Sequence, residues 1–346
     1  MLMPPQTTYP IDDSSQIGNA RRAAADLAAL LAFDPTQAGR LALAINETGT
    51  NILKHAGRGR LLLRSIEHAG IGGVELIALD KGPGIADLET SLRDGYSTRG
   101  TLGGGLGALS RVASNFQIYT QPGKGTALRM ELWSRPIPAR EDAVELGGVC
   151  LAKPRESVSG DAWAVEFSRA GVTALVADGL GHGSDAHDAA RLATDQLAAH
   201  PHSEPLELLE ICHAALARTR GAAVAVAKLI APAGRGSYAS VGNIVCRVEH
   251  APGSRQLVSY NGIVGHTMRK TQELAFPWPE RALLILHSDG LGTQWDLAAY
   301  PGLAARHPAL IAAVLYRDYD RGRDDVTVVV LRNRGTAPRQ GLVTGP

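Results

Sequence analysis

Hydrophobic and polar positions follow a helical period near the start of this chain and a strand period soon afterwards. Apolar residues recur at helical spacing over 15–33, and a second helix is expected over about 36–56, after the break at Asp34-Pro35-Thr36. Shorter apolar runs at 61–66 and 74–79 are bounded by turn residues and predict strands. The remaining elements of this half are expected at 106–112 (helix), 116–120 and 126–133 (strands).

The second half is richer in strands. Two helical patterns, at 184–199 and 204–219, are grouped between them. The strands are expected at 147–152, 162–168, 173–177, 222–230, 236–241, 244–249, 256–260, 282–287 and 326–331. This order predicts a layered α+β or sandwich domain and argues against a doubly wound parallel sheet.

A polar segment separates the two halves. The chain has 346 residues, a length typical of about two domains. After residue 133 the sequence SRPIPARED combines two prolines with four charges, which is typical of a linker. We therefore expect domains at 1–134 and 146–334, a linker at 135–145 and a flexible tail at 335–346.

Composition narrows the functional classes. The net charge of +1 gives no electrostatic reason to expect nucleic acid or an anionic membrane as a partner. The three cysteines lack CxxC spacing, which argues against a thiolate zinc site or a disulfide framework. The first residues lack a basic region followed by an apolar core, and no apolar stretch reaches the ~20 residues of a membrane span. A cytoplasmic protein is expected.

The first candidate site begins on the second helix. Glu47 and Asn51 lie four residues apart in INETGTN, so both side chains project from one helical face. Their oxygens are of the kind that Mg²⁺ prefers. Asp80 follows an apolar strand in DKGPG, where it could accept a hydrogen bond from an adenine amino group, while Gly82 and Gly84 let the base approach the backbone.

Two glycine-rich segments complete this site. The segment at 100–111, GTLGGGLGALSR, places glycines ahead of a helix, where free N–H groups favour phosphate. No strand precedes it, so a dinucleotide-binding Rossmann fingerprint is disfavoured. GKGT turns into the last strand, where Thr126 could hold Asp80 or a bridging water.

Together, in this order, these motifs resemble the GHKL ATPase superfamily with its Bergerat fold. Over about residues 7–133 they are similar to the RsbT-type switch kinases and anti-sigma factors of bacterial partner switching. The resemblance implies ATP with Mg²⁺, with Asn51 as metal ligand and Asp80 reading adenine, while Glu47 would serve as general base or polarise the attacking hydroxyl. It implies a pocket edge and lid formed by Gly82, Gly84, Gly103, Gly105 and Gly107, with Leu106 and Thr126 as further cofactor-binding residues. The pair Gly104-Gly105 departs from the usual GLGLG.

The second candidate site consists of aspartates at the ends of strands. Read singly, the aspartates of SGDAW, VADGLGHG, LHSDGL and RDDVTV are ordinary turn residues. Two of them follow strongly apolar runs and the last precedes an apolar strand, which would bring the strand ends together. Carboxylates without partner lysines repel one another unless cations lie between them. The residues concerned are Asp161, Asp178, Asp289 and Asp324.

This set resembles the SpoIIE/RsbX branch of the PPM-type metal-dependent serine/threonine phosphatases over about 146–332. The resemblance implies an α-β-β-α sandwich and two Mn²⁺ or Mg²⁺ ions held by those four aspartates and the carbonyl of Gly179. It makes Asp325 a weaker candidate ligand and the Gly-Asn turn at Asn243 a structural feature. Leu180 stands where eukaryotic relatives have a histidine, and His182 does not inherit that role by position alone. Arg155 is a candidate for binding phosphate.

The two resemblances together imply a bifunctional partner-switching regulator. The N-terminal domain would phosphorylate serine or threonine on a STAS-domain partner, and the C-terminal domain would remove phosphate from such a partner. A sigma factor is a further candidate partner, and a homodimer is compatible with the sequence. The alternative is a phosphatase whose N-terminal domain is a non-catalytic, ATP-dependent binding module. A purely structural role for both halves would require the ordered motifs to be accidental turns.

Overall fold

The computed structural model describes residues 4–92, 105–140, 142–168, 171–250, 253–269 and 271–335. The chain forms two compact units. The N-terminal unit comprises Pro4–Ala139 and Gln294–Tyr319, and the C-terminal unit comprises Arg140–Thr293 and the chain from Asp320 onward. Residues 294–319 thus return to the N-terminal unit, a feature that the expected continuous segments 1–134 and 146–334 do not include.

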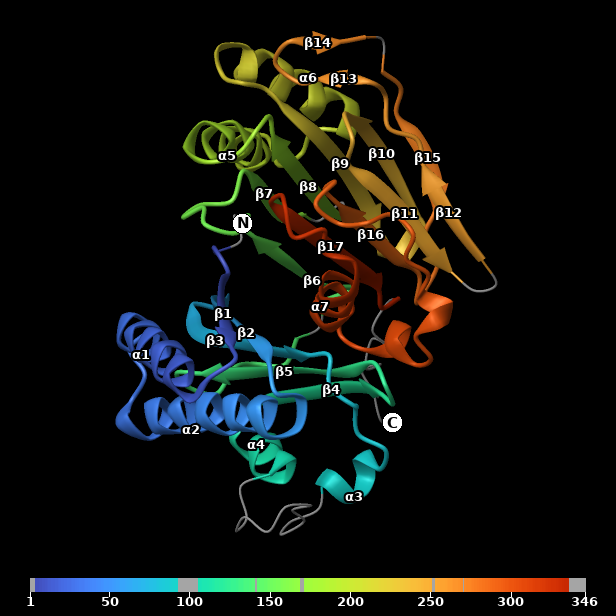
Figure 1. Cartoon of the computed structure of the whole chain (residues 1–346). Helices are drawn as coiled ribbons and strands as arrows, with labels where there is room; N and C mark the ends of the chain where they lie inside the picture. The colour runs from blue at the N-terminus through green and yellow to red at the C-terminus, as the bar shows by residue number, and fades with distance from the viewer. Residues whose placement is uncertain are drawn as a thin grey trace, which may run out of the picture. The chain divides into compact units, whose positions relative to one another are not determined.

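The N-terminal unit is built on a five-stranded antiparallel sheet in the order β1-β2-β3-β5-β4. Two long helices, α1 (Ser14–Leu30) and α2 (Pro35–Asn51), cover one face of the sheet (Figure 1). The apolar side chains of β2, β3 and β5 on this face form a core with those helices. The strands are β1 (Thr7–Ile11), β2 (Gly59–His68), β3 (Ile71–Asp80), β4 (Asn115–Gln121) and β5 (Gly125–Trp133).

Local sequence explains where these helices begin and end. The Asp13 side chain caps α1 in a reciprocal capping box with Gln16. Asp34 caps α2, and Pro35 occupies its first turn, where a missing N–H costs nothing. The helical pattern expected to run to residue 56 changes character after Asn51, because Ile52–Ala56 forms a turn of π-helix. Such turns are often found beside functional sites.

The returning segment contains a helix that sequence periodicity does not predict. Helix α7 (Pro308–Tyr319) packs against β3, β4 and β5 of the N-terminal sheet. The His307 side chain accepts a hydrogen bond from the Ala309 N–H and so caps its start. All residues from Pro308 to Arg317 are buried, so the sequence shows no polar face.

The C-terminal unit contains two five-stranded sheets in the orders β15-β10-β9-β8-β7 and β12-β11-β16-β17-β6. Apolar side chains of both sheets meet in one core. The main strands are β6 (Val144–Leu151), β7 (Asp161–Ser168), β8 (Gly171–Gly179), β9 (Ala222–Ile230), β10 (Arg235–Val241), β11 (Val245–His250), β12 (Gly253–Leu257), β15 (Leu274–Pro277), β16 (Leu283–His287) and β17 (Val326–Asn333).

Two helices, α5 (Ser184–Ala199) and α6 (Pro205–Ala215), cover the outer face of the first sheet (Figure 1). Among the described residues of this unit, α5 and α6 are the two α-helices. Helix α7 follows β16 along the chain but belongs to the N-terminal unit. No helix among the described residues is both long and apolar enough to cross a lipid bilayer.

Short elements that the sequence patterns do not predict complete both units. They are α3 (Leu88–Leu92) in the N-terminal unit, and β13 (Gly262–Ile263) and β14 (Thr267–Met268) in the C-terminal unit. Strands β1 and β15 are likewise additions to the expected set. Each is too short to show a periodic pattern of its own.

Candidate functional site

The first group of expected site residues lies on α2 and at the end of β3, which is in contact with the π-helical turn that follows α2. Glu47 and Asn51 both lie on α2 and are partly buried, one helical turn apart. Asp80 is the last residue of β3, and Gly59 at the start of β2 is its register partner. The chain leaves α2 through the π-helical turn and enters β2 directly, which explains how short local connections bring these elements together.

The Asp80 carboxylate organises the turn that follows it. Its Oδ1 accepts hydrogen bonds from the N–H groups of Gly82, at 2.8 Å, and Thr126, at 3.2 Å. Burial raises the pKa of Asp80, while these two N–H groups act in the opposite direction. Because both bonds reach one oxygen, the second carboxylate oxygen is left for another donor. Thr126, which the sequence suggested would hold Asp80, thus contacts it through its backbone N–H.

Two glycines of this region are required by close backbone approach. A Cβ at Gly84, whose φ is +73°, would lie 2.4 Å from the Gln121 carbonyl oxygen. A Cβ at Gly125, whose φ is +88°, would lie 2.1 Å from the Asp80 carbonyl oxygen. Gly125 was not among the residues expected from the sequence. Neither was Thr120, whose hydroxyl accepts from the Ile85 N–H and lies 3.2 Å from the Thr126 hydroxyl.

The glycine-rich segment is described only from Gly105 onward, and the expected site residue Gly103 lies outside the described residues. Gly105 precedes α4 (Leu106–Val112), which begins and ends where the sequence predicts. Gly107 is buried within α4, and Leu106 packs against the core of the unit. Leu106 therefore has a packing role in addition to its expected place at the pocket edge.

The second group of expected residues begins with two aspartates on neighbouring strands. Asp161 starts β7, Asp178 lies near the end of β8, and the two are register partners in the antiparallel pair. Directly opposed like charges destabilise a sheet. Asp161 is almost fully buried, and its Oδ2 accepts a 2.6 Å hydrogen bond from the Ser288 hydroxyl. The sheet thus holds two opposed acids at one strand end.

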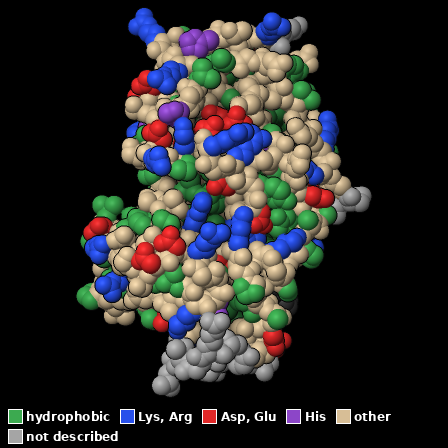
Figure 2. Space-filling model, in the orientation of Figure 1, with side chains coloured by type: hydrophobic (Ala, Val, Ile, Leu, Met, Phe, Trp, Pro, Cys, Tyr) green, Lys and Arg blue, Asp and Glu red, His purple; other side chains and the backbone are tan. Residues whose placement is uncertain are grey.

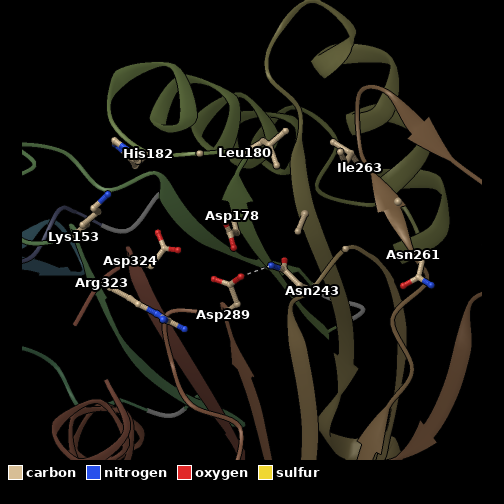
Figure 3. Close-up of a pocket in the computed structure, with 14 residues that line it drawn as sticks. Lys153, Asp178, Leu180, His182, Asn243, Asn261, Ile263, Asp289, Arg323 and Asp324 are labelled. Carbon is tan, nitrogen blue, oxygen red and sulfur yellow. Dashed lines mark hydrogen bonds between the residues drawn. The ribbon is translucent and has the colours of Figure 1, made fainter. Parts of the chain in front are cut away.

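Asp289 and Asp324 reach the same place from the second sheet. Asp289 follows β16, and Asp324 precedes β17. With Asp178 they line one cavity of about 490 Å³, and in Figure 3 the three side chains turn toward a common space. The Asn243 amide donates to Asp289 Oδ2 at 2.7 Å. Asn243, which was expected to be structural, therefore orients one of the expected ligands.

Asp325 and Gly179, two further candidates for metal binding, lie beside the cavity residues Asp324 and Asp178 in the sequence. The Asp325 carboxylate is buried, and its Oδ1 accepts from the Lys153 N–H, so it does not line the cavity as Asp324 does. Gly179 ends β8 beside α5, where a Cβ would lie 2.0 Å from the Ala186 carbonyl oxygen. The packing thus requires glycine at 179, and the cavity geometry favours Asp324 over Asp325 as a ligand.

Two acids of this site, Asp178 and Asp161, have raised pKa values, so protonation of these two carboxylates is favoured in the absence of cations. Burial, together with the neighbouring carboxylates of Asp161, Asp289, Asp324 and Asp325, raises the pKa of Asp178 to about 9. Burial also raises the pKa of Asp161 to about 7. A cation between the carboxylates would stabilise their charged forms and so lower both pKa values.

The residues therefore fit hard divalent cations, which bind carboxylate oxygens. Asp178, Asp289 and Asp324 line the cavity, whereas the buried Asp161 is not among its lining residues. Among the described residues, no set of three or more His, Cys, Asp or Glu side chains could hold a metal ion as they stand. Hydrogen bonds from Ser288 to Asp161 and from Asn243 to Asp289 fix the orientations of these two carboxyl groups.

Basic side chains line the same cavity. Lys153 and Arg323 contribute to its wall, and Arg323 extends below Asp324 and Asp289 in Figure 3. The space-filling view shows basic side chains beside acidic ones on the surface of the C-terminal unit (Figure 2). The expected phosphate-binding candidate Arg155 is not among the lining residues. His182 also lines the cavity, with its Nδ1 2.8 Å from Glu156 Oε1, whereas Leu180 is exposed at the wall.

Comparisons with known proteins identify relatives of both halves of the chain. The family model of the histidine kinase-like ATPase domain matches residues 12–132. The serine/threonine-protein kinase RsbT of Bacillus subtilis (strain 168) is 34% identical over 116 residues, which are 34% of this chain and 87% of RsbT. The phosphoserine phosphatase RsbX of the same organism is 25% identical over 143 residues, which are 41% of this chain and 71% of RsbX.

A solved structure from work on the bacterial stressosome shares the fold. It has a TM-score of 0.51 and 28% sequence identity, and the match covers 55% of this chain and 99% of the solved chain. The expected combination of a GHKL domain with a PPM-type domain is confirmed by these relatives. The chain belongs to the RsbT-like family of histidine kinase-like ATPases, joined here to a PPM-type domain similar to RsbX.

Proposed function

We propose that this chain is a bifunctional partner-switching regulator. Its C-terminal unit removes phosphate from phosphoserine or phosphothreonine of a protein partner, and its N-terminal unit transfers phosphate from ATP to such a residue. The observation that best supports the phosphatase is the opposed pair Asp161 and Asp178, of which Asp178 lines one cavity together with Asp289 and Asp324. No structural role explains why a sheet would retain facing acids whose charges destabilise it.

The proposed metal ligands are Asp161, Asp178, Asp289, Asp324 and the carbonyl of Gly179. Two Mn²⁺ or Mg²⁺ ions held there would supply a water molecule activated for attack on phosphorus. Hydrolysis would join a water oxygen to phosphorus and release that water's proton to solvent, while the bond from phosphorus to the serine oxygen would break with its electrons leaving on that oxygen. Ser288 and Asn243 keep Asp161 and Asp289 in orientation by hydrogen bonds.

The basic residues of the cavity provide phosphate recognition. Arg323 and Lys153 place positive charge at the wall where the aspartates converge, and charge-assisted hydrogen bonds to phosphate oxygens are stronger than neutral ones. His182 is paired with Glu156, so an oriented imidazole is present to give the departing serine oxygen its proton. The exposed Leu180 cannot supply that proton.

The proposed kinase reaction uses the N-terminal unit. Asp80 reads the adenine amino group through its second carboxylate oxygen, and Asn51 contributes a ligand for Mg²⁺. Glu47, one turn before Asn51 on α2, accepts the proton of the attacking hydroxyl. The hydroxyl oxygen bonds to the γ-phosphorus, and ADP departs with the electrons of the broken bond.

The proposed partners are STAS-domain proteins, because the relatives RsbT and RsbX carry names of a kinase and a phosphatase, and a solved relative comes from the stressosome. A sigma factor and a homodimer remain part of the proposal. A cytoplasmic location follows from such partners.

Separate assays test the two reactions. Manganese-dependent hydrolysis of a phosphoserine peptide should be abolished in Asp289→Asn and unchanged in Glu47→Ala. Transfer of labelled phosphate from ATP to STAS-domain proteins should show the opposite dependence. If labelled ATP binds but the wild-type chain transfers phosphate to no partner, the N-terminal unit is a binding module. Full peptide hydrolysis by Asp289→Asn would refute the metal assignment.

A further inference from the structure

The segment 294–319 makes specific contacts with the N-terminal sheet. The Lys124 ammonium lies 5.1 Å from the Tyr300 ring centroid and donates to the Ala299 carbonyl. The Gln117 side chain accepts from the His307 N–H at 2.7 Å. Further along α7, Arg60 donates to the Tyr316 hydroxyl. Contacts at both ends and in the middle therefore fix this segment on the strands of the N-terminal unit.

A further contact of this segment reaches Asp80, a residue of the proposed nucleotide site. The buried Arg317 donates from Nη1 to the Asp80 carbonyl oxygen at 3.3 Å. Its guanidinium is held in place by Asp318, with which it forms two hydrogen bonds of 2.9 and 2.8 Å. The Tyr300 hydroxyl in turn donates to Asp318 at 2.9 Å. Arg317 thus has a fixed orientation on the residue proposed to read adenine.

Both ends of the same segment lead into the proposed metal ligands. It starts shortly after Asp289 and ends shortly before Asp324. Where the chain re-enters the C-terminal unit, Leu291 and Asp320 form a β-bridge, and the Arg321 N–H donates to the Gly290 carbonyl at 3.0 Å. The base of the segment is therefore closed by residues that neighbour the two ligands in sequence, which gives a covalent route from α7 to both.

We propose that Arg317 is a positioning residue of the nucleotide site and that α7 couples nucleotide binding to metal binding at Asp289 and Asp324. This inference rests on the proposed function of the two sites and adds a regulatory link between them. Adenine bound to Asp80 fixes the end of β3 against Arg317, and Arg317 fixes α7. The flanking residues then favour one arrangement of the two ligands.

Coupling between two binding sites must be reciprocal, and it typically changes an affinity by about 5- to 150-fold. Two constants measured on the full chain test it. The first is the Kd of a fluorescent ADP analogue at saturating Mg²⁺. The second is the Mn²⁺ concentration for half-maximal hydrolysis of p-nitrophenyl phosphate, with and without saturating ADP at the same Mg²⁺ concentration. In the wild type we expect ADP to change the Mn²⁺ constant at least about fivefold.

Arg317→Ala should weaken ADP-analogue binding by about fivefold or more and remove the effect of ADP on the Mn²⁺ constant. Arg317→Lys, which keeps the charge but loses the paired bonds to Asp318, should restore part of both effects. The matched control is Arg40→Ala, which removes an exposed arginine of α2 and should leave both constants unchanged. If Arg317→Ala does not fold, Asp318→Asn removes the partner that orients the guanidinium and should lose the coupling.

The outcomes separate this inference from the proposed function. If the ADP analogue binds and Mn²⁺ supports hydrolysis, but neither constant depends on the other ligand, the coupling is refuted and the two activities stand. Wild-type ADP affinity in Arg317→Ala would also refute it. If the analogue does not bind, or hydrolysis does not need metal, then the proposed function fails and the coupling fails with it.

Discussion

Replacing Asp178 by asparagine should stabilise the metal-free protein while destroying its response to metal. Asp178 faces Asp161 across β7 and β8, and the substitution removes one of two opposed acids while keeping nearly the same side-chain volume. Burial and four neighbouring carboxylates raise the pKa of Asp178 from 3.8 to about 9. The folded state therefore retains a proton that the unfolded chain has already released.

The direction and size of the effect follow from that difference. A raised native pKa means that stability falls as the pH rises from 3.8 toward 9, by up to about 1.4 kcal/mol per pH unit. At pH 7 the accumulated penalty has an upper limit of about 4 kcal/mol, and at pH 5 it is below about 2 kcal/mol. Relaxation of the partly exposed site reduces it, so we expect a gain of about 1–4 kcal/mol in Asp178→Asn at pH 7.

Calorimetric unfolding in the presence of a chelator measures this gain. For a unit of this size, the transition of the C-terminal unit should rise by about 3–10 °C at pH 7, with a larger rise at pH 8 than at pH 5. Adding Mn²⁺ should raise the transition of the wild type because the metal binds only the folded state, but should hardly affect Asp178→Asn. Asp195→Asn, at an exposed position of α5, is the matched control and should show neither effect.

Two results would refute this reasoning. The first is a metal-free Asp178→Asn protein that unfolds at a lower temperature than the wild type at pH 8. The second is a difference between the two proteins that does not grow with pH. Either result would mean that the pKa of Asp178 is not raised in the folded state.

Three further substitutions test other parts of the account. Gly125→Ala should lower the free energy of unfolding by more than about 2 kcal/mol and abolish binding of the ADP analogue, because a positive φ and a backbone clash both oppose a side chain there. Gly123→Ala, at a similar φ but with open space around it, should cost only about 1 kcal/mol and retain binding. Thermal unfolding and a fluorescence titration compare the two variants. Asn243→Ala should raise the Mn²⁺ constant about 10- to 100-fold by releasing Asp289, as an activation titration would show, and an unchanged constant would remove its orienting role. Arg323→Ala should raise KM for a phosphoserine peptide about 10-fold or more. Arg255→Ala, which removes an exposed arginine of β12, should leave KM unchanged. Equal KM values in the two variants would exclude Arg323 from phosphate binding.

Periodic segments and strand-end aspartates were predictable from the sequence because their signals are local. Helix α4 has the predicted bounds, and α5 and β9 coincide with their expected ranges. Asp178 and Asp289 could be selected because each follows a strongly apolar strand that must be buried, so that its polar end residue is placed at an edge of the sheet.

The residues that were missed act through contacts distant in sequence. Helix α7 gives no amphipathic signal because it is buried throughout, and its Arg317 reaches Asp80 from a segment that sequence order assigns to the other domain. Asn243 resembles an ordinary turn residue until Asp289 is placed beside it. The requirement for glycine at 125 arises from the Asp80 carbonyl, and no local pattern contains that information.

The most direct test of the central claim follows one labelled phosphate on one STAS-domain protein. The intact chain is given that protein and γ-labelled ATP with Mg²⁺, ATP is then removed, and Mn²⁺ is added. We predict that label appears on a serine or threonine in the first step and is released as inorganic phosphate in the second. Glu47→Ala should block the first step, and Asp289→Asn should block only the second. Release of label by Asp289→Asn at the wild-type rate would contradict the account.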